Sequence, residues 1–131
     1  MNIVMIKNFL IISCTGQNDK VGLKINDNFF VHDFKNKVQN NEILVLSILN
    51  LTKNHKVNID KEISVLVNKG PGSFSSIRAA IAVAKGIAIS KGSKLFGYKN
   101  ADLPQFSLEN IEVLISKNLI EKNLIKPLYL S

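Results

Sequence analysis

Cysteine is nearly absent from this sequence and histidine is scarce, which excludes several kinds of site. Cys14 is the only cysteine, so neither an intrachain disulfide nor a CxxC metal or redox site can form. A chain without disulfides is typical of a reducing compartment, and we expect a cytoplasmic protein. The two histidines, His32 and His55, stand alone, and neither belongs to a cluster with the spacing of metal ligands. The sequence therefore predicts no bound metal.

Catalytic motifs are also missing. No GxSxG nucleophile elbow occurs, and no serine has a nearby histidine or lysine marked as its base. The aspartates sit in or near turns, where they ordinarily cap the local backbone; these are Asp19, Asp27, Asp33 and Asp60. Without a paired nucleophile and base, we expect no catalytic residue and no cofactor in this chain.

No apolar run is long enough to span a membrane. The opening residues, MNIVMIKNFLIISC, nevertheless place a lysine, an apolar run and a Ser13-Cys14 pair where a bacterial lipoprotein signal has them. The run after Asn8 is shorter than the usual signal core, and strand-like sequence follows Cys14 instead of a flexible tether. We therefore expect no attachment to a membrane.

The overall composition fits one globular domain with a substantial core. The chain has 131 residues, of which 46% are hydrophobic, and no linker or internal repeat divides it. The formal charge of +7 comes mostly from lysines spread along the whole sequence. No stretch groups four or five basic residues or interleaves them with aromatic residues. Direct binding of nucleic acid is therefore an alternative without support of its own.

The hydrophobic pattern predicts elements in the order βββαβαβ. An asparagine, Asn40 or Asn41, is expected to cap the first helix, and Gly92 to end the second. Each crossover between parallel strands should be right-handed. After Asn100 the pattern weakens: residues 108–115 fit a helix or a strand, and we expect this part to cover the exposed side of the sheet. The predicted strands are 9–15, 21–25, 29–34, 63–67 and 94–98, and the predicted helices are 42–53 and 73–90.

The segment from Lys69 to Tyr98, KGPGSFSSIRAAIAVAKGIAISKGSKLFGY, joins a glycine-rich turn to a helix that is apolar nearly all round. Between Ala79 and Ile89 its only charge is Lys85, so two faces of the helix are unsuited to water. A sheet covers only one of them, and the other must meet a second helix or another protein. The alanine and glycine content would allow close backbone approach, which favours an interface.

The turn itself, Gly70, Pro71, Gly72 and Ser73, has a structural and a functional interpretation. Structurally, the glycines supply unusual backbone angles and Ser73 caps the helix. Functionally, amides at a helix N-terminus can surround an anion, but the turn lacks the GxxxxGK[ST] and GxGxxG patterns. Arg78, the only arginine, suits either a bidentate contact to a carboxylate or phosphate or a local salt bridge.

The residues from Lys69 to Gly97 resemble the signature segment of the TsaB (YeaZ) family, the partner subunit of the bacterial tRNA threonylcarbamoyladenosine synthase. Family members carry a GPGSFTGxR turn, an alanine-rich helix ending in KGxA, and a strand with a central glycine. This chain has GPGSFSSIR followed by AKGIAIS, and its closing KPLYLS is similar to the family's C-terminal end. The resemblance covers the first hundred residues in outline.

Three departures accompany this match. The chain has ISCT at 12–15 where family members usually carry an IDTS-like strand end, and SS at 75–76 where they carry TG. Most of the family's second lobe is missing. The sequence thus resembles an internally shortened homologue, with a single Gcp-like domain over 1–131 in which 101–131 form a shortened remnant and the C-terminal tail.

The resemblance implies an α/β fold of the RNase H-like, actin-like ATPase (ASKHA) class, with the first lobe as a βββαβαβ mixed sheet with helices packed on it. It also implies a non-catalytic platform subunit in tRNA threonylcarbamoyladenosine biosynthesis. One lobe without clustered acidic or histidine ligands would not reproduce the metal and nucleotide site of the related catalytic subunit. The implied partners are a TsaD-like catalytic subunit and a TsaE-like ATPase, with a homodimer when the protein is alone, and tRNA is contacted only indirectly.

In this family the first-lobe helices form the pairing surface, so the resemblance places the partner contact on the two helices. The expected contact residues are Leu44, Ile48 and Leu51 of the first helix and Phe74, Ile77, Arg78, Ala82 and Lys85 of the second. The alternative from a different class is a small nucleotide- or tRNA-binding module that uses the turn 70–73 and the lysine-rich surface. A peptidase, a label once attached to the wider family, would need a nucleophile or metal ligands that this chain lacks.

Overall fold

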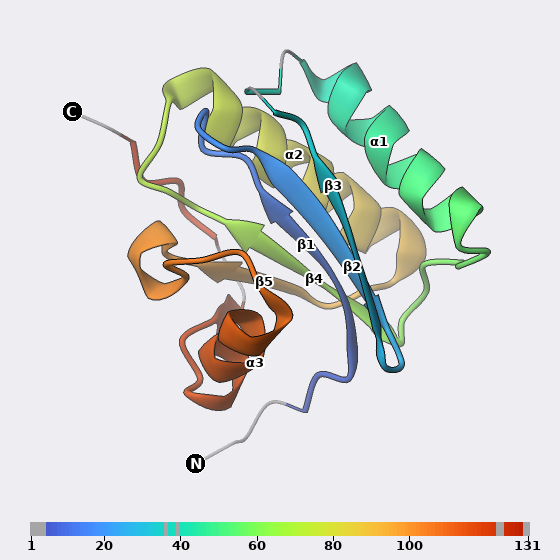
Figure 1. Ribbon diagram of the computed structural model, residues 1–131. Helices are drawn as coiled ribbons and strands as arrows, with labels where there is room; N and C mark the ends of the chain where they lie inside the picture. Colours follow the sequence, from blue (N-terminus) through green and yellow to red (C-terminus); the bar gives the residue numbers. More distant parts are fainter. Residues whose placement is uncertain (1–4, 36, 39, 123–124, 130–131) are drawn as a thin grey trace.

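A six-stranded mixed sheet organises the part of the chain that the computed structural model describes, which is residues 5–35, 37–38, 40–122 and 125–129. The strand order across the sheet is β3-β2-β1-β4-β5-β6. The strands are β1 (Asn8–Ser13), β2 (Lys20–Ile25), β3 (Asn28–Asp33), β4 (Ile63–Asn68), β5 (Leu95–Tyr98) and β6 (Glu121–Lys122). The helices are α1 (Asn41–Asn54), α2 (Phe74–Lys91), the 3-10 helix η1 (Asn100–Asp102) and α3 (Leu108–Ser116) (Figure 1).

The topology agrees with the predicted βββαβαβ order. Strands β1, β2 and β3 form an antiparallel meander, whereas β1, β4 and β5 run parallel to one another through the crossover helices. Leu10 pairs with Leu23 on one side and with Val65 on the other, which sets the register of the three central strands. The short strand β6 adds an antiparallel edge beside β5.

Strand β1 is covered on both faces, which explains its unbroken apolar sequence. Leu10 and Ile12 face one core, while Phe9 and Ile11 face the other. A strand buried on both sides needs a continuous hydrophobic run, and this resembles the core of a signal sequence. The run that suggested a lipoprotein signal therefore forms the middle of the sheet, and the four residues that open that segment lie outside the described part.

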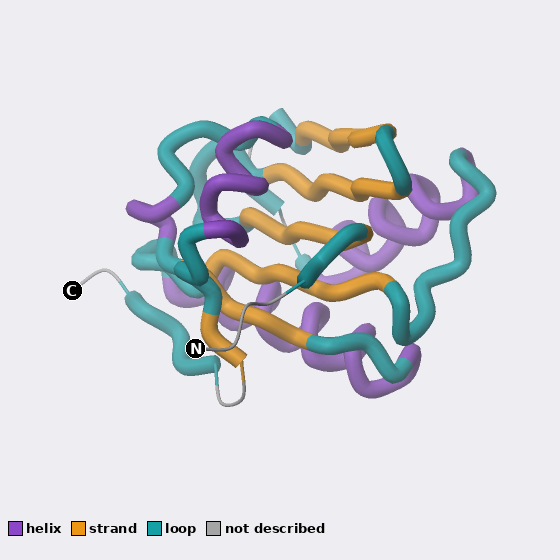
Figure 2. Tube along the Cα trace, turned by 90° about the horizontal axis from the view of Figure 1, so that it is seen from below, coloured by secondary structure: helices purple, strands orange, loops and turns teal. Residues whose placement is uncertain are grey.

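Helices α1 and α2 cover one face of the sheet (Figures 1 and 2). Asn40 caps α1, since its side-chain oxygen accepts a hydrogen bond from the Ile43 N–H at 2.9 Å. Helix α2 ends at Gly92, which adopts the left-handed conformation that glycine tolerates, at φ 69°. Both caps agree with the sequence. The core beneath these helices contains Leu44, Ile48, Leu51, Ile77, Ala80, Ile81 and Ala84 together with side chains of β1, β2 and β4.

Helix α3 covers the opposite face of the sheet, which settles the ambiguity of residues 108–115. Ser107 caps it by accepting a hydrogen bond from the Asn110 N–H at 3.2 Å. Ile111, Leu114 and Ile115 form a helical stripe that packs on the sheet. The sheet thus lies between two helical layers, as Figure 2 shows, and the expectation that this part covers the second face is confirmed. Among the helices described, none combines the length and the apolar character that a membrane crossing needs.

Candidate functional site

The turn between β4 and α2 is held by polar groups of the chain itself. The Asn68 side-chain oxygen accepts a hydrogen bond from the Gly70 N–H, and the Ser73 N–H donates to the Thr15 carbonyl oxygen, each at 2.9 Å. The Ser73 hydroxyl accepts from the Ser76 N–H at 3.3 Å, so Ser73 caps α2 as the sequence predicted. Gly70 has a φ of 103°, which side-chain-bearing residues avoid. Three amides that an anion at this turn would need already donate within the chain.

Gly72 serves a different purpose from the one expected. Its φ lies outside the left-handed region, so the backbone angle does not require glycine. A Cβ atom there would lie 2.7 Å from the Thr15 carbonyl oxygen, which is closer than atoms can pack. Gly72 is therefore needed because the turn after β1 approaches it closely.

Helix α2 has one buried face and one exposed face. Its buried face carries Ala88 and four residues of the core, Ile77, Ala80, Ile81 and Ala84. At the two ends of the exposed face, Phe74 is 57% exposed and Ile89 is 83% exposed. Between them lie Arg78, Ala82, Lys85 and Gly86, spaced at helical intervals along one stripe.

Helix α1 also exposes apolar side chains. Leu46 is 57% exposed and Leu49 is 55% exposed, although both are leucines in the middle of a helix. The two helices contact each other along the sheet. We call their outer surface the helix-pair face, and it consists of Leu46, Leu49, Phe74, Arg78, Ala82, Lys85, Gly86 and Ile89.

The structure divides the expected partner-binding residues into two groups. Leu44, Ile48, Leu51 and Ile77 are buried in the core of this chain, so their side chains do not reach the surface. Phe74, Arg78 and Ala82 are exposed, and Lys85 is partly exposed. Apolar spacing places residues on a face but does not show which of two apolar faces the sheet covers. The sequence analysis did not single out Leu46, Leu49, Gly86 and Ile89, which the structure places on the surface opposite the buried positions.

Gly86 lies in the C-terminal half of the exposed stripe, where no contact within the described chain requires a glycine. A Cβ atom built there would have no neighbour within 4 Å beyond the helix itself. Glycine inside a helix destabilises it by about 0.5–1 kcal/mol relative to alanine. Nothing within the described chain requires so small a residue at this position.

The C-terminal segment completes one end of the helix-pair face. The Leu128 N–H donates to the Lys69 carbonyl oxygen at 2.7 Å, which brings Tyr129 beside the start of α2. The Tyr129 and Phe74 ring centroids lie 4.8 Å apart, and the Arg78 guanidinium carbon lies 4.9 Å from the Phe74 centroid. Sequence analysis did not predict this contact. Its only signal was the KPLYLS motif, whose last two residues lie outside the described part.

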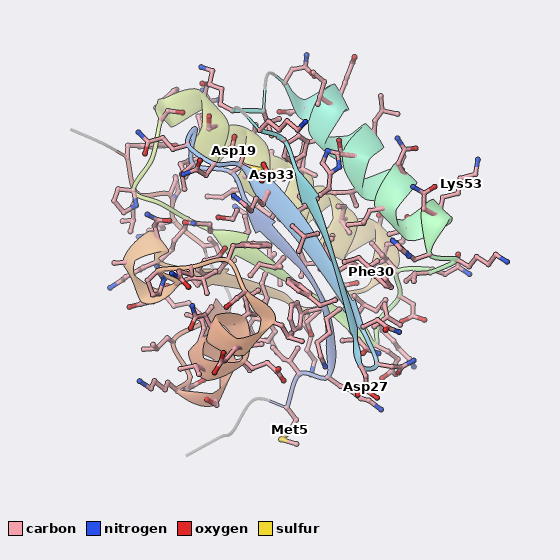
Figure 3. All side chains as sticks on the ribbon, in the orientation of Figure 1. Met5, Asp19, Asp27, Phe30, Asp33 and Lys53 are labelled. Atoms are coloured by element: carbon pink, nitrogen blue, oxygen red, sulfur yellow. The ribbon has the colours of Figure 1, made fainter. Side chains whose placement is uncertain are left out.

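The charge of the two helices is predominantly positive. Helices α1 and α2 carry four basic residues, Lys53, Arg78, Lys85 and Lys91, against a single acidic one, Glu42. Lys53 extends outward from the last turn of α1 (Figure 3). Within the described ranges, the ion pairs are Lys20 with Asp33 and Lys69 with Glu121, so neither Arg78 nor Lys85 is neutralised by a carboxylate of the described chain.

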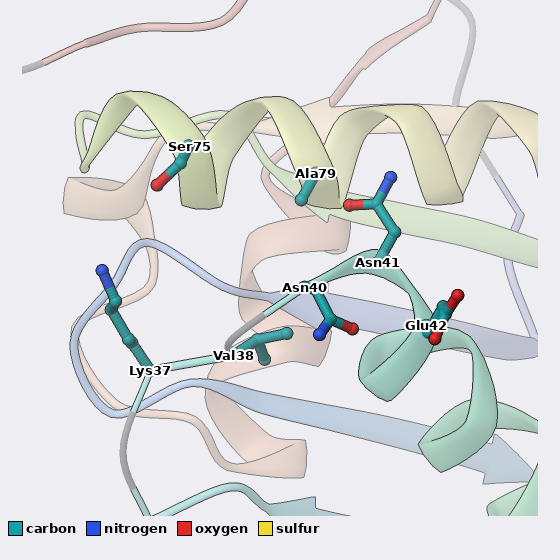
Figure 4. A pocket seen from close by; sticks show the side chains of 7 residues that line it. All are labelled: Lys37, Val38, Asn40, Asn41, Glu42, Ser75 and Ala79. Atoms are coloured by element: carbon teal, nitrogen blue, oxygen red, sulfur yellow. The ribbon is translucent and has the colours of Figure 1, made fainter.

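A pocket of about 500 Å³ opens between the first turn of α1 and the first two turns of α2 (Figure 4). Val38, which lines the pocket, is held in place because its N–H donates to the buried Asp19 carboxylate at 2.7 Å. The Asn40 side chain is already engaged in capping α1. The pocket therefore lies at the N-terminal ends of α1 and α2. It is lined by Lys37, Val38, Asn40, Asn41, Glu42, Ser75 and Ala79.

Asp19 (labelled in Figure 3) shows what the expected turn-capping aspartates do in this fold. Its side chain is fully buried, and its carboxylate accepts hydrogen bonds from the Gly16 N–H at 2.9 Å and from the Val38 N–H. Asp33 and Asp60 similarly accept from the Lys35 and Glu62 amides. These three carboxylates hold the backbone in place.

Polar side chains also meet at the carboxyl ends of β1, β4 and β5. The Asn68 side-chain amide donates to the Ser13 hydroxyl at 3.2 Å and to the Asn100 side-chain oxygen at 2.9 Å. Burial raises the pKa of the nearby Tyr98 hydroxyl above its ordinary value, and the Ser13 and Asn68 side chains oppose that rise. This cluster consists of neutral groups and joins the three strand ends.

The thiol and the imidazoles occupy structural positions. Burial raises the pKa of the Cys14 thiol, and the Asp19 carboxylate raises it further, so the reactive thiolate is suppressed. His55 stacks on Phe30 with 3.5 Å between ring centroids, and His32 meets Phe34 edge-on at 4.7 Å. Over the described ranges, no three His, Cys, Asp or Glu residues lie where they could hold a metal ion together.

Comparison with solved structures identifies the architecture. The chain superposes on YeaZ from Pseudomonas aeruginosa with a TM-score of 0.66 over 75% of its length. The fold is that of YeaZ. The sequence identity is 18%, and the match covers 46% of the YeaZ chain, so this chain spans a little under half the length of that protein. The YeaZ-like arrangement agrees with the expected α/β fold, a mixed sheet with helices packed on it.

A second solved structure gives the same result. It is an uncharacterized protein with similarity to peptidase YeaZ from Pseudomonas aeruginosa, and it matches with a TM-score of 0.66, 18% identity and coverage of 45% of its chain. No protein-family model and no curated protein matches the sequence. At this level of identity, the YeaZ likeness establishes the fold.

Proposed function

We propose that this chain is a non-catalytic platform subunit in tRNA threonylcarbamoyladenosine biosynthesis, and that its helix-pair face binds a TsaD-like catalytic subunit. The observation that carries the proposal is the exposed stripe of α2, where Phe74 and Ile89 flank the small residues Ala82 and Gly86. Apolar groups at these positions remain in water in the isolated chain, and a partner helix would cover them.

Two further observations support the same function. The YeaZ-like fold occurs together with the GPGSFSSIR segment, and the residues of that segment are the ones that begin α2. The hydroxyl of Ser73 and the amides of its turn are committed to internal hydrogen bonds, which favours a scaffold over a nucleotide cradle. In this proposal the partner supplies the chemistry and the tRNA contacts, and a TsaE-like ATPase joins the same cytoplasmic assembly.

The direct test measures solution mass by light scattering on a sizing column. The purified chain is run alone and after mixing with the purified TsaD-like subunit of the same organism. We expect a new species with the summed mass of one copy of each protein. If the mixture elutes as the two separate proteins at every concentration tested, the proposed function is wrong.

The Ala82→Glu substitution tests whether the contact lies on the helix-pair face. Ala82 is exposed, so glutamate there should leave the fold and the helical circular dichroism unchanged. In the complex the same carboxylate would be buried at the contact, which is costly without a partner group. We expect the affinity to fall at least about tenfold, equivalent to about 1.4 kcal/mol.

The matched control for this variant is Ala101→Glu. Ala101 is also exposed, but it lies on η1, outside the helix-pair face. We expect the control to bind like the unchanged chain. Equal loss of binding in both variants would show that the contact is elsewhere or that added negative charge acts nonspecifically.

A further inference from the structure

The amino ends of the parallel strands gather lysines that are far apart in the sequence. They come from the segments before β1, β4 and β5, from the end of β2, and from the ends of α1 and α2 (Figure 1). We infer that this basic edge binds the phosphate backbone of a nucleic-acid duplex directly. The inference does not depend on a TsaD-like partner, and it differs from the sequence-based expectation that tRNA is contacted only indirectly. The basic edge consists of Lys7, Lys24, Lys53, Lys56, Lys61, Lys91 and Lys94.

The register of the sheet places four of these lysines in one row. Strands β1, β4 and β5 are parallel neighbours that start at the same edge, with Asn8 paired to Ile63. Lys24 joins the row from β2, since its Nζ atom donates to the Lys7 carbonyl oxygen at 2.8 Å. Neighbouring strands lie about 4.8 Å apart, so a row across four strands spans about 15 Å. The lysines of this row are Lys24, Lys7, Lys61 and Lys94.

The ends of α1 and α2 add a second group beside this row. Each helix leads through a short connection into a parallel strand, α1 into β4 and α2 into β5. The two connections touch each other, because the Ser93 hydroxyl donates to the Asp60 carbonyl oxygen at 2.9 Å. Lys53, Lys56 and Lys91 therefore lie at the same end of the molecule as the row.

The ammonium groups of the basic edge are not neutralised within the described chain. Lys24 is partly exposed, and the other six lysines are exposed. Both ion pairs of the described ranges, Lys20 with Asp33 and Lys69 with Glu121, lie elsewhere. An excess of unpaired cations on one surface attracts a polyanion. The carboxylates at the same end are fewer than the lysines, and they are Asp27, Asp60, Glu62 and Glu112.

Helix electrostatics explains only part of this pattern. Lys53 and Lys91 lie in the last turns of α1 and α2, where a cation complements the negative end of a helix. Strands have only small net dipoles, so the same reason does not apply to Lys7, Lys61 and Lys94. The row along the strand ends is therefore left for an anion outside the chain.

A hollow beside the end of α1 adds neutral donors to these charges. Its volume is about 680 Å³, and its lining includes Lys53 and Lys56 together with the amide side chains of Asn50 and Asn58. Ammonium and amide groups are the donors that contact the phosphate and sugar oxygens of nucleic acids. The hollow therefore offers the backbone of a nucleic acid both charge and hydrogen bonds.

A duplex fits this edge better than a single strand does. Binding of a single strand uses aromatic rings on which successive bases stack. His55 lies between Lys53 and Lys56, but its ring is stacked on Phe30 with 3.5 Å between the centroids. A duplex carries about one phosphate charge per 1.7 Å of its axis, so a row of about 15 Å faces several phosphates at once.

The experiment measures the affinity of the purified chain for a short RNA hairpin and for a DNA hairpin of the same sequence. Fluorescence anisotropy is recorded at several salt concentrations. Each phosphate contact contributes about −0.9 to the slope of log affinity against log salt, and we expect a slope of about −4 or steeper. The triple variant Lys53→Gln, Lys61→Gln and Lys94→Gln should make the slope shallower by about 3 and lower the affinity at least about tenfold.

The matched control is the triple variant Lys37→Gln, Lys99→Gln and Lys126→Gln. These lysines are exposed and lie toward the opposite, carboxyl end of the parallel strands, and the change in net charge is the same. We expect the control to bind both hairpins within twofold of the unchanged chain. Circular dichroism and thermal unfolding show that each variant is folded.

The outcomes separate this inference from the proposed function. Binding of both hairpins supports a contact to phosphates, and binding of the RNA hairpin alone supports it with added contacts to 2′-hydroxyl groups. Absence of binding, or equal weakening in the two triple variants, would overturn the inference. Binding to vesicles of anionic phospholipid without binding to either hairpin would assign the edge to a membrane surface instead. The complex with the TsaD-like subunit is measured independently by solution mass, and it should form equally well with both triple variants.

Discussion

Lys69 holds its ammonium group almost entirely out of water at the end of β4. The residue is 6% exposed, and its Nζ atom lies 2.6 Å from a carboxylate oxygen of Glu121, which is half exposed. The hydrogen bond from Lys69 holds the pKa of the Glu121 carboxyl below its usual range, and the positive charge of Lys99 acts in the same direction. This ion pair ties β6 to the segment that leads into the glycine-rich turn.

The Glu121→Gln substitution should therefore destabilise the protein in a pH-dependent way. We expect a loss of about 1 kcal/mol or less at neutral pH, because the carboxylate is partly screened by water. A carboxyl whose pKa is lowered by folding stabilises the native state when the pH is above its pKa in the unfolded chain, about 4.3. That stabilisation is lost as the pH falls through its pKa in the folded protein. The difference between variant and unchanged chain should thus shrink on acidification from neutral pH to about pH 3.

Urea unfolding at neutral and acidic pH measures this difference. Glu112→Gln is the control, because Glu112 is an exposed carboxylate of α3 with no described ion pair. A difference between Glu121→Gln and the unchanged chain that stays constant with pH would mean that the ion pair contributes nothing to stability.

At the scale of a secondary-structure element, α2 has a buried stripe that stabilises it and an exposed stripe that contains a destabilising glycine. Its interior stripe is well packed, yet its exposed stripe contains Gly86, which weakens the helix. The sequence shows that both stripes are apolar. It therefore predicts where the helix begins and ends, but not which of its faces packs on the sheet. Only a helix with one polar face reveals from its own pattern which side meets water.

The Gly86→Ala substitution should strengthen the isolated protein. No neighbour lies within 4 Å of the added methyl group, so we expect an increase of about 0.5–1 kcal/mol in the free energy of unfolding. The reverse change on the same face, Ala82→Gly, should lower it by a similar amount. Thermal or urea denaturation checks both. If alanine at position 86 destabilises the chain, the site is not the open helical position described here.

At the scale of the whole molecule, the two cores share the central strands. Alternate residues of β1 contribute to each, with Leu10 in the core under α1 and α2 and Phe9 in the core under α3. Loss of either helical layer would expose one face of the same strands to water. The two layers should consequently unfold together in a single transition.

The Ile111→Ala substitution tests this coupling. Ile111 is fully buried under α3, and removing its side chain should cost about 2–5 kcal/mol. We expect the helical circular dichroism and the tyrosine fluorescence to show one transition, shifted to lower urea. Val113→Ala on the exposed side of the same helix should cost about 0.5 kcal/mol or less. Early loss of α3 alone, before the rest of the structure, would contradict the shared core.

The sequence by itself determined the elements up to residue 98, their order and the caps of the first two helices. Asn40, Ser73 and Gly92 mark helix ends through short-range hydrogen bonds and backbone angles, and these depend only on neighbouring residues. Continuous apolar runs identified the central strands because strands covered on both sides need them. The GPGSFSSIR segment also led to the YeaZ-like fold that the structure shows.

Only the tertiary structure decided which residues face outward. It buried Leu44, Ile48, Leu51 and Ile77, and it left Leu46, Leu49, Gly86 and Ile89 on the surface. It also brought Tyr129 against Phe74 across more than fifty positions of sequence. The spacing of apolar residues predicts a helix but does not show which of its faces packs on the sheet. Contacts between segments far apart in the sequence leave no pattern in either segment. The sequence therefore predicted an apolar surface on the two helices, but only the folded chain shows which residues form it.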